Sequence, residues 1–255
     1  MSRLAVLAAG ALLVSASSSA WASSVTFGQF FQKNTSARLF RYKNKDVGAT
    51  RAAEIYTIPT PGSTTLGSIP VFYVMGGGVL PADLTGPQNA LLQVDFFSSQ
   101  GTTGVGSSRV QLFDSGTITI MRTTPALEGL NSKTNLLTVT FTNAELDASQ
   151  NNGSFTFKSN ANSVITYTSD FMNFSNVITK DFSLSFSGSN PTFQAPIGKS
   201  AKNMTFSGTG TFASDPAPIT IGAPEASTWA MLVLGFGGIG ALMRSGRRTK
   251  DLFAA

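Results

Sequence analysis

The chain has 255 residues, of which 42% are hydrophobic and 12% charged, and it contains neither cysteine nor histidine. The lack of cysteine excludes a scaffold of intramolecular disulfides, and the lack of both residue types excludes the common zinc and copper sites and Ser-His-Asp triads. The net charge is +5, but residues 23–223 hold 13 Lys and Arg against 11 Asp and Glu. The middle of the chain therefore gives no case for nucleic-acid binding.

Residues 1–22 are predicted to be a secretory signal peptide. Arg3 supplies the positive start, an apolar run extends from Leu4 to Val14, and Ala20 and Ala22 frame a cleavage site of the A-x-A type. The mature chain is then expected to begin at residue 23. A buried helix of the folded domain is the alternative, but the three features occur in the order that export requires.

The strip of cations near the start of the mature chain is the first candidate binding site. Its five members lie within fourteen residues: Arg38, Arg41, Lys43, Lys45 and Arg51. Alternate residues of a strand point to one face, so Arg41, Lys43 and Lys45 are expected on one side and Tyr42 on the other. Two interpretations stay open. The strip could meet an acidic polysaccharide, or it could be a solvated or edge-strand face on which lysines discourage aggregation.

Residues 23–213 are predicted to fold as an all-β ectodomain. Apolar side chains alternate with hydroxyl-bearing ones in short segments, which is typical of half-buried antiparallel strands. The segments cover residues 92–96, 110–112, 118–120, 137–141, 155–157, 182–186 and 204–212. Glycine-rich turns separate them, and Asn152-Gly153 favours a tight hairpin. We therefore expect an antiparallel β-sandwich of jelly-roll-like type, with a short helical turn between residues 81 and 90 as an exception.

The acidic residues of the body are scattered. Asp95 is expected on the polar face of its strand, Asp170 at a turn or helix N-cap, and Asp181 at the start of a strand. Glycoside hydrolysis needs two carboxyl groups about 5 to 9.5 Å apart, and eleven acids in about 200 residues will produce close pairs by chance. A structural calcium ion is a further alternative, although no D-x-D-x-D-G loop is present. We assign no catalytic residue, metal ligand or cofactor.

Adjacent aromatic residues occur at Phe30-Phe31 and Phe96-Phe97. Each pair could stack against a sugar, but we interpret one member as core and the other as a contact between sheets. The serines and threonines that alternate with phenylalanine are interpreted as the outer faces of strands. No G-x-S-x-G motif is present, and no histidine could activate such a serine.

The C-terminal part of the chain is predicted to be a linker followed by one transmembrane helix and a short tail, at residues 214–223, 229–243 and 251–255. Fifteen helical residues span about 22 Å against a hydrocarbon core of about 30 Å. Trp229 at one interface and arginines that snorkel at the other would help this short fit. The cations that follow are expected to stay in the cytoplasm, with the body outside: Arg244, Arg247, Arg248 and Lys250.

Glycines in the apolar run match the pattern G-x-G-x-x-G at Gly235, Gly237 and Gly240. A dinucleotide site needs a preceding strand, a following helix and an acidic residue about 20 residues further on. Only fifteen residues follow Gly240. We therefore interpret these glycines as allowing close packing or local opening of the helix.

The segment 224–250 resembles a PEP-CTERM sorting signal, most closely the PEPxxWA form, with Ala226 at the third motif position. The resemblance depends on residues that occur in order around the apolar helix: Pro224, Glu225, Trp229, Ala230, Arg244, Arg247 and Arg248. It implies that a membrane-embedded exosortase recognises the chain and cleaves near Pro224-Glu225, releasing the body to the cell surface or the exopolysaccharide matrix. A plain C-terminal anchor is the alternative. Residues 136–212 also resemble ectodomains that often precede such tails, through the segments 136–141, 166–171 and 208–213. This resemblance does not indicate any particular biochemical activity.

From these observations we expect an exported surface or matrix protein with a structural or adhesive role linked to exopolysaccharide or biofilm. It is expected to be anchored in the inner membrane only transiently and to have no enzymatic activity. The expected partners are the export machinery, an exosortase, the membrane through the C-terminal helix, and exopolysaccharide. A carbohydrate-binding module for acidic polysaccharide is the alternative, and a glycan-active enzyme is a more remote one.

Overall fold

The computed structural model describes residues 24–76, 84–123 and 133–220. Within these ranges the chain forms strands and no α-helix, and every pairing of strands is antiparallel, so the predicted all-β antiparallel class is confirmed. The strands are β1 (Val25–Gln32), β2 (Phe40–Asn44), β3 (Ala53–Thr57), β4 (Ile69–Met75), β5 (Pro87–Ser98), β6 (Ser108–Arg122), β7 (Asn135–Ser149), β8 (Phe155–Lys158), β9 (Val164–Thr168), β10 (Met172–Asn173), β11 (Thr179–Asn190), β12 (Met204–Asp215) and β13 (Ile219–Thr220).

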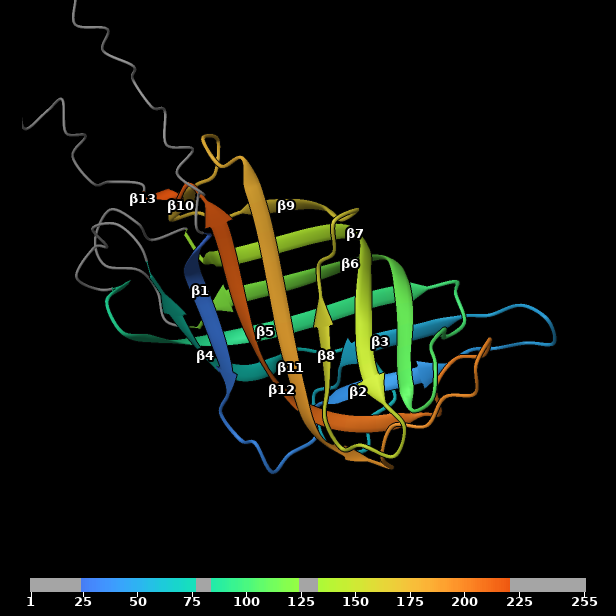
Figure 1. Ribbon diagram of the computed structural model, residues 1–255. Helices are drawn as coiled ribbons and strands as arrows, with labels where there is room; N and C mark the ends of the chain where they lie inside the picture. Colours follow the sequence, from blue (N-terminus) through green and yellow to red (C-terminus); the bar gives the residue numbers. More distant parts are fainter. Residues whose placement is uncertain (1–23, 77–83, 124–132, 221–255) are drawn as a thin grey trace, which may run out of the picture.

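Hydrogen bonding between the strands runs in a closed circuit. It passes from β1 through β4, β5, β6, β7, β8, β11 and β12 and returns to β1. The short pair β2–β3 bridges β12 and β5, and β9 pairs with β7. Figure 1 shows two layers in which β8, β11 and β12 cross over β5, β6 and the first half of β7. The layers face each other as in a sandwich, but shared strands connect them into one sheet of eleven strands.

The strand order differs from the jelly-roll order that we expected. Consecutive strands pair from β4 through β8, and again in β2–β3 and β11–β12, whereas a jelly roll is built from Greek keys. The alternation of apolar and polar residues specifies which face of a strand is buried. It does not specify which strand lies beside which, so the sequence pattern could not distinguish the two orders.

The long strands β6 and β7 belong to both layers because they bend together (Figure 1). Phe113 and its partner Ala144 point into the core, and so do Ile118 and its partner Val139. These positions differ in parity, so the inward face changes between them. Asn143 lies at this corner with a φ of 58°, a left-handed conformation that asparagine tolerates better than most residues.

Phenylalanine rings fill the space between the layers. The Phe157 ring lies 4.5 Å from that of Phe96 and 5.2 Å from that of Phe113, measured between centroids. Fully burying one such side chain stabilises the fold by roughly 1.5–3 kcal/mol. The inward positions predicted from alternation are buried as expected in β7, β8, β11 and β12: Leu137, Val139, Phe141, Phe155, Phe157, Phe182, Leu184, Phe186, Met204, Phe206 and Phe212.

Two further expectations about local structure are refined. Of the short helical turn expected within residues 81–90, Leu84 has 3-10 conformation and residues 81–83 lie outside the described residues. From Pro87 onward the chain is strand, because residues 88, 90 and 92 continue the buried face of β5. The predicted linker at residues 214–223 overlaps folded structure, since β12 continues to Asp215 and β13 pairs with β10. Proline content suggested a linker there, but pairing with a distant segment overrides this local signal.

Several predictions fall outside the described residues, namely the signal peptide at 1–22, the sorting motif and the transmembrane helix at 229–243. In the part of the chain that the structure describes, no helix is long and apolar enough to cross a membrane. Asp170 lies in the bend between β9 and β10. Its carboxylate accepts hydrogen bonds from the backbone N–H groups of Thr134, at 2.9 Å, and Asn135, at 2.8 Å, so it caps a loop at the start of β7.

The inward glycines of β12 give a test of the packing. A Cβ at Gly210 would meet the Phe30 ring and a methyl group of Leu184. We expect Gly210→Ala to lower the free energy of unfolding by about 1–3 kcal/mol through overpacking. Urea denaturation measures this change. The control is Gly153→Ala, where a Cβ meets nothing within 4 Å and the change should stay within about 0.5 kcal/mol. Equal stability of the two variants would contradict the packing described here.

Candidate functional site

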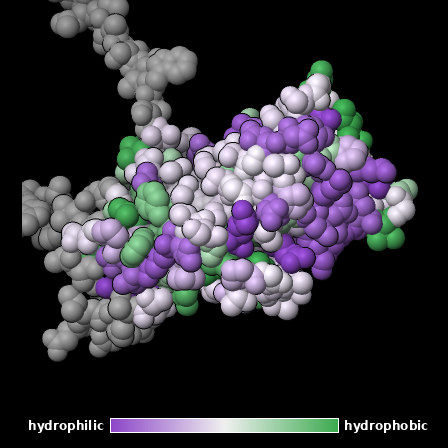
Figure 2. Space-filling view, turned by 90° about the horizontal axis from the view of Figure 1, so that it is seen from below, coloured by the Kyte–Doolittle hydropathy of each residue, from purple (hydrophilic) through white to green (hydrophobic). Residues whose placement is uncertain are grey.

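The predicted cation strip lies on a central strand. β2 pairs with β12 on one side and with β3 on the other, so the interpretation as an edge strand is wrong. Arg41 and Lys43 face outward and Tyr42 is fully buried on the opposite face, as expected. Hydrophilic residues gather on the lower face of the molecule toward the end where the 44–52 turn projects (Figure 2).

Most cations of the strip are bound to other groups of the protein. Arg38 donates a hydrogen bond through Nε to the carbonyl of Gly188, and Arg51 donates through Nε to the carbonyl of Gly198 at 2.7 Å. Lys45 forms an ion pair with Glu54. Arg41 donates through a guanidinium N–H to the carbonyl of Ser63 at 3.0 Å. These cations therefore tie loops together and do not form an unpaired basic surface.

Asp46 fixes the turn that carries this strip. Its carboxylate accepts hydrogen bonds from the Ser200 hydroxyl at 2.7 Å, the Ser200 N–H at 3.0 Å and the Ala52 N–H at 3.1 Å, and Arg51 lies 3.8 Å away. Burial acts to raise the pKa of Asp46, but these hydrogen bonds and the nearby cation outweigh it and lower the pKa. The ionised carboxylate of Asp46 thus links the turn to the loop before β12.

A buried polar network, which the sequence did not indicate, lies beneath the strip. The Tyr42 hydroxyl donates to Gln111 Oε1 at 2.7 Å and accepts from the Ala201 N–H at 3.0 Å. Burial raises the pKa of Tyr42 to about 12. Arg109, also buried, donates through Nε to the carbonyl of Ala195 at 2.9 Å. Each group holds the segment 195–201 against the sheet, which is a structural role.

Two adjoining hollows on the outer surface share Asp95. The first has a volume of about 330 Å³ and lies over β5, β6 and β7. The second, of about 220 Å³, lies over β2, β3 and the 59–67 loop. The residues that line the first are Asp95, Phe97, Ser115, Gly116, Thr117, Thr140 and Phe141. Those that line the second are Lys43, Glu54, Tyr56, Thr64, Leu66 and Asp95.

The Asp95 carboxylate is unusual for a surface acid. It faces outward, as expected, and the structure gives it no hydrogen bond and no ion pair with any described residue. Burial and the negative charge of Glu54 raise its pKa, and Lys45 opposes this rise. Perturbed carboxyl groups in hollows are typical of functional sites, although structural groups can show the same shift. Asp95 is therefore an acid in a hollow whose carboxylate is available to a ligand.

Threonines form regular rows beside Asp95. In antiparallel register, Asp95 on β5 lies opposite Thr117 on β6, Thr117 opposite Thr140 on β7, and Thr140 opposite Thr166 on β9. The neighbouring row runs in the same way through Gln93, Thr119, Thr138 and Thr168. A third row, at the other side of Asp95, runs through Phe97, Ser115, Thr142 and Val164. We call these twelve positions the threonine face.

In each adjacent aromatic pair, one ring is buried as expected, but the other is exposed to solvent. Phe30 and Phe96 are fully buried, but Phe31 is 44% exposed and Phe97 is 43% exposed. The outward members therefore do not make the contact between sheets that we expected. Phe97 borders the hollow at Asp95. Its exposed ring could therefore stack against a sugar, which was the less favoured interpretation of this pair from the sequence.

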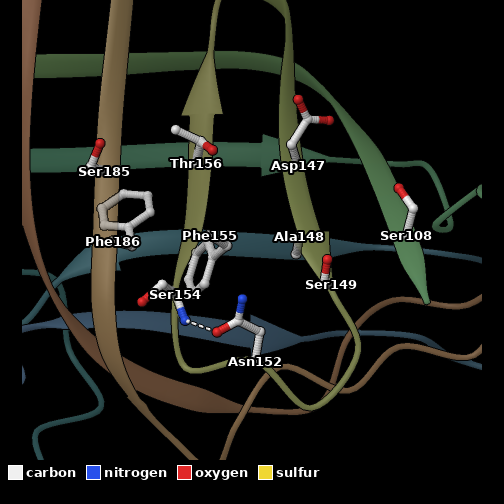
Figure 3. Close-up of a pocket in the computed structure, with 10 residues that line it drawn as sticks. All are labelled: Ser108, Asp147, Ala148, Ser149, Asn152, Ser154, Phe155, Thr156, Ser185 and Phe186. Carbon is white, nitrogen blue, oxygen red and sulfur yellow. Dashed lines mark hydrogen bonds between the residues drawn. The ribbon is translucent and has the colours of Figure 1, made fainter.

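A third hollow, of about 580 Å³, lies over β7, β8 and β11 (Figure 3). Serine, threonine and asparagine side chains line it, with Asp147 on one side. The Asp147 carboxylate forms an ion pair with Lys158 at 2.6 Å. The aromatic residues of the lining, Phe155 and Phe186, are buried at 5% and 2% exposure. This hollow thus offers hydroxyl groups, but its acid is neutralised and its rings are covered.

The remaining candidate acids are used within the protein. Asp181 accepts a hydrogen bond from the Ser159 hydroxyl, and Asp170 caps a loop. Among residues 24–76, 84–123 and 133–220 no cluster of three or more acidic side chains is arranged to hold a metal ion. Comparisons with protein-family models, with curated proteins and with solved structures found no match to this chain.

The opposite pKa shifts of Asp46 and Asp95 predict opposite effects of substitution. The lowered pKa means that ionised Asp46 stabilises the fold, so Asp46→Asn should lower the unfolding free energy at pH 7 by about 1 kcal/mol through lost hydrogen bonds. This loss should shrink as the pH falls through the acidic range in which the carboxyl titrates.

Asp95→Asn is the matched comparison. Its raised pKa means that ionised Asp95 opposes folding at neutral pH, so the variant should be at least as stable as the parent at pH 7 and lose this advantage in acid. Thermal unfolding between pH 3 and pH 7 measures both variants. A stability loss at pH 7 for Asp95→Asn equal to that of Asp46→Asn would contradict this assignment.

Proposed function

We propose that this chain is an exported surface or extracellular-matrix protein with a structural or adhesive role linked to exopolysaccharide. In this proposal a signal peptide at residues 1–22 directs export and the C-terminal segment acts as a PEP-CTERM sorting signal. An exosortase then cleaves near Pro224-Glu225 and releases the β-sandwich-like body. The observation that carries the proposal is the ordered set of sorting residues that follows directly on the body.

The topology of the body is compatible with loss of both ends. The closed circuit of strands uses only residues between Val25 and Asp215, so removal of the predicted leader and sorting segment takes no strand from it. Val25 lies opposite Ser214 in the β1–β12 pair. The chain therefore enters the circuit and leaves it at the same end, which suits a domain that is held by one end and then released.

The alternatives are less well supported. Binding of acidic polysaccharide through the cation strip has little support, because four of its five members are bound to carbonyls or to a carboxylate. Hydrolysis of a glycan would need two available carboxyl groups. Asp95 and Glu54 lie on neighbouring strands, but Glu54 is paired with Lys45. We therefore propose a protein that binds or builds a matrix and does not modify it.

Processing can be tested by tryptophan content. The chain has two tryptophans, Trp21 and Trp229, and each lies in an end that the proposal removes. All four tyrosines lie between residues 42 and 167. Protein recovered from the cell surface should show tyrosine emission without tryptophan emission, and its intact mass should place the cuts before residue 23 and near residue 225. Tryptophan emission from the surface form would argue against the proposed processing.

Retention in the membrane before cleavage gives a second test. Deletion of residues 244–250 removes all four cations that are proposed to hold the tail on the cytoplasmic side. Uncleaved precursor should then decrease in the inner-membrane fraction, as measured by immunoblotting of fractionated cells. Deletion of residues 251–255, which leaves these four cations in place, serves as a control for expression. Unchanged fractionation and processing after the first deletion would count against the proposed topology.

A further inference from the structure

We propose that the hollow at Asp95 and the adjoining threonine face bind an extended, neutral polysaccharide chain. The inference rests on the proposed adhesive function, because it names the site and the ligand class through which the domain would adhere. It replaces the cation strip as the binding surface. The observations that carry it are the free carboxylate, the exposed ring of Phe97 and the unoccupied hydroxyl groups of Ser115, Thr117 and Thr140.

The groups around the hollow match what a sugar ring presents. One face of a pyranose is made of C–H groups, and such a face packs against an aromatic ring such as Phe97, which borders the hollow and is 43% exposed. Sugar hydroxyls need acceptors, and the Asp95 carboxylate accepts no hydrogen bond from a described residue. Charge-assisted hydrogen bonds of this kind are the stronger ones.

The hydroxyl groups of the lining are also free. The structure gives the side chains of Ser115, Thr117 and Thr140 no hydrogen bond to any described residue, so they can donate to a ligand and accept from it. Thr138 differs, since its hydroxyl donates to Asn135 Oδ1 at 3.0 Å. The row that begins at Asp95 thus has the largest unoccupied hydrogen-bonding capacity next to the ring of Phe97.

The repeat of the rows favours a polymer over a single sugar. Neighbouring strands are spaced by about 4.8 Å, which is close to the length of one pyranose residue in an extended chain. A chain that lies across β5, β6, β7 and β9 would therefore meet one residue of a row per sugar unit. Successive rows lie about 6.8 Å apart along the strands, so a neighbouring row can contact the other edge of the same chain.

The charge of the surface favours a neutral ligand. Of the twelve positions of the threonine face, only Asp95 carries a charge. In the adjoining hollow the negative charge of Glu54 is paired with Lys45, and Lys43 lies on the far side. The threonine face therefore presents no cation that would attract a polyanion, and Asp95 would oppose the binding of one.

The other surfaces compare less well. In the hollow of Figure 3 the acid is bound to Lys158 and the rings are covered. The exposed ring of Phe72 on β4 has the Lys33 ammonium over it at 4.8 Å from its centroid. At Asp95, by contrast, a ring, an acceptor and several hydroxyl groups converge and none of the polar groups is occupied.

The test is calorimetry with the full chain in a detergent that has no sugar headgroup, because such a headgroup would compete. The neutral probes are cellohexaose and laminarihexaose, and an alginate hexamer is the acidic comparison. We expect binding of a neutral probe to weaken by about tenfold in Phe97→Ala through loss of ring contact. In Phe31→Ala, an equally exposed phenylalanine on β1, affinity should be unchanged.

A second variant removes hydroxyl groups without changing shape. Thr117→Val combined with Thr140→Val keeps the β-branched side chains, so it should keep the parent's thermal stability and weaken neutral-probe binding by about threefold or more. Amide chemical shifts should move around residues 93–97, 115–119 and 138–142 when the probe is added.

Three results would overturn the assignment. They are no binding of either neutral hexasaccharide, binding of alginate alone, or neutral binding with shifts confined to other strands. None of these results bears on the proposed export and cleavage. Those are tested separately by the intact mass of protein recovered from the cell surface.

Discussion

Packing of phenylalanine rings between the two layers is the interaction on which the rest of this structure depends. Rings from β5, β6, β7, β8 and β11 contact one another through Phe157, which lies against Phe96, Phe113, Phe141 and Phe182. Each ring touches partners from other strands, so the layers cannot slide without losing several contacts at once. The core therefore constrains the register of β5, β6 and β7, whose outer faces carry nine of the twelve positions of the threonine face.

The inward glycines show how tightly this core constrains the chain. Side chains at Gly116, Gly208 or Gly210 would run into the rings of neighbouring phenylalanines. The large residues thus require small ones opposite them, and the two sets must change together. The outward positions are not bound by this rule. They can be threonine, serine or asparagine without affecting the core, which leaves the surface chemistry free to serve the proposed adhesion.

Local pattern was enough to predict much of the fold. The alternation in segments such as Leu137 to Phe141 placed strands and their buried faces correctly, because a period of two depends only on neighbouring residues. The closed circuit, the corner at Asn143 and the pairing of Ile219 depend on partners far away in the chain, so no local signal contained them. Proline content near Pro216 pointed instead to a linker.

The candidate site was predicted only in part, for the same reason. The outward direction of Asp95 followed from its neighbours in β5. The exposure of Phe97 did not, because it depends on whether a second layer covers that side of the sheet. The cation strip was expected to be free, but Arg38 and Arg51 are bound to carbonyls about 150 positions away in sequence, at Gly188 and Gly198.

The closed circuit of strands also bears on how the domain would carry mechanical load. Tension entering through the C-terminal end of β12 has three parallel routes to the strands of the threonine face, through β1 and β4, through β2 and β3, and through β11 and β8. Each route consists of antiparallel ladders. Rupture would require all three routes to fail, so a pull on the domain would be divided among them.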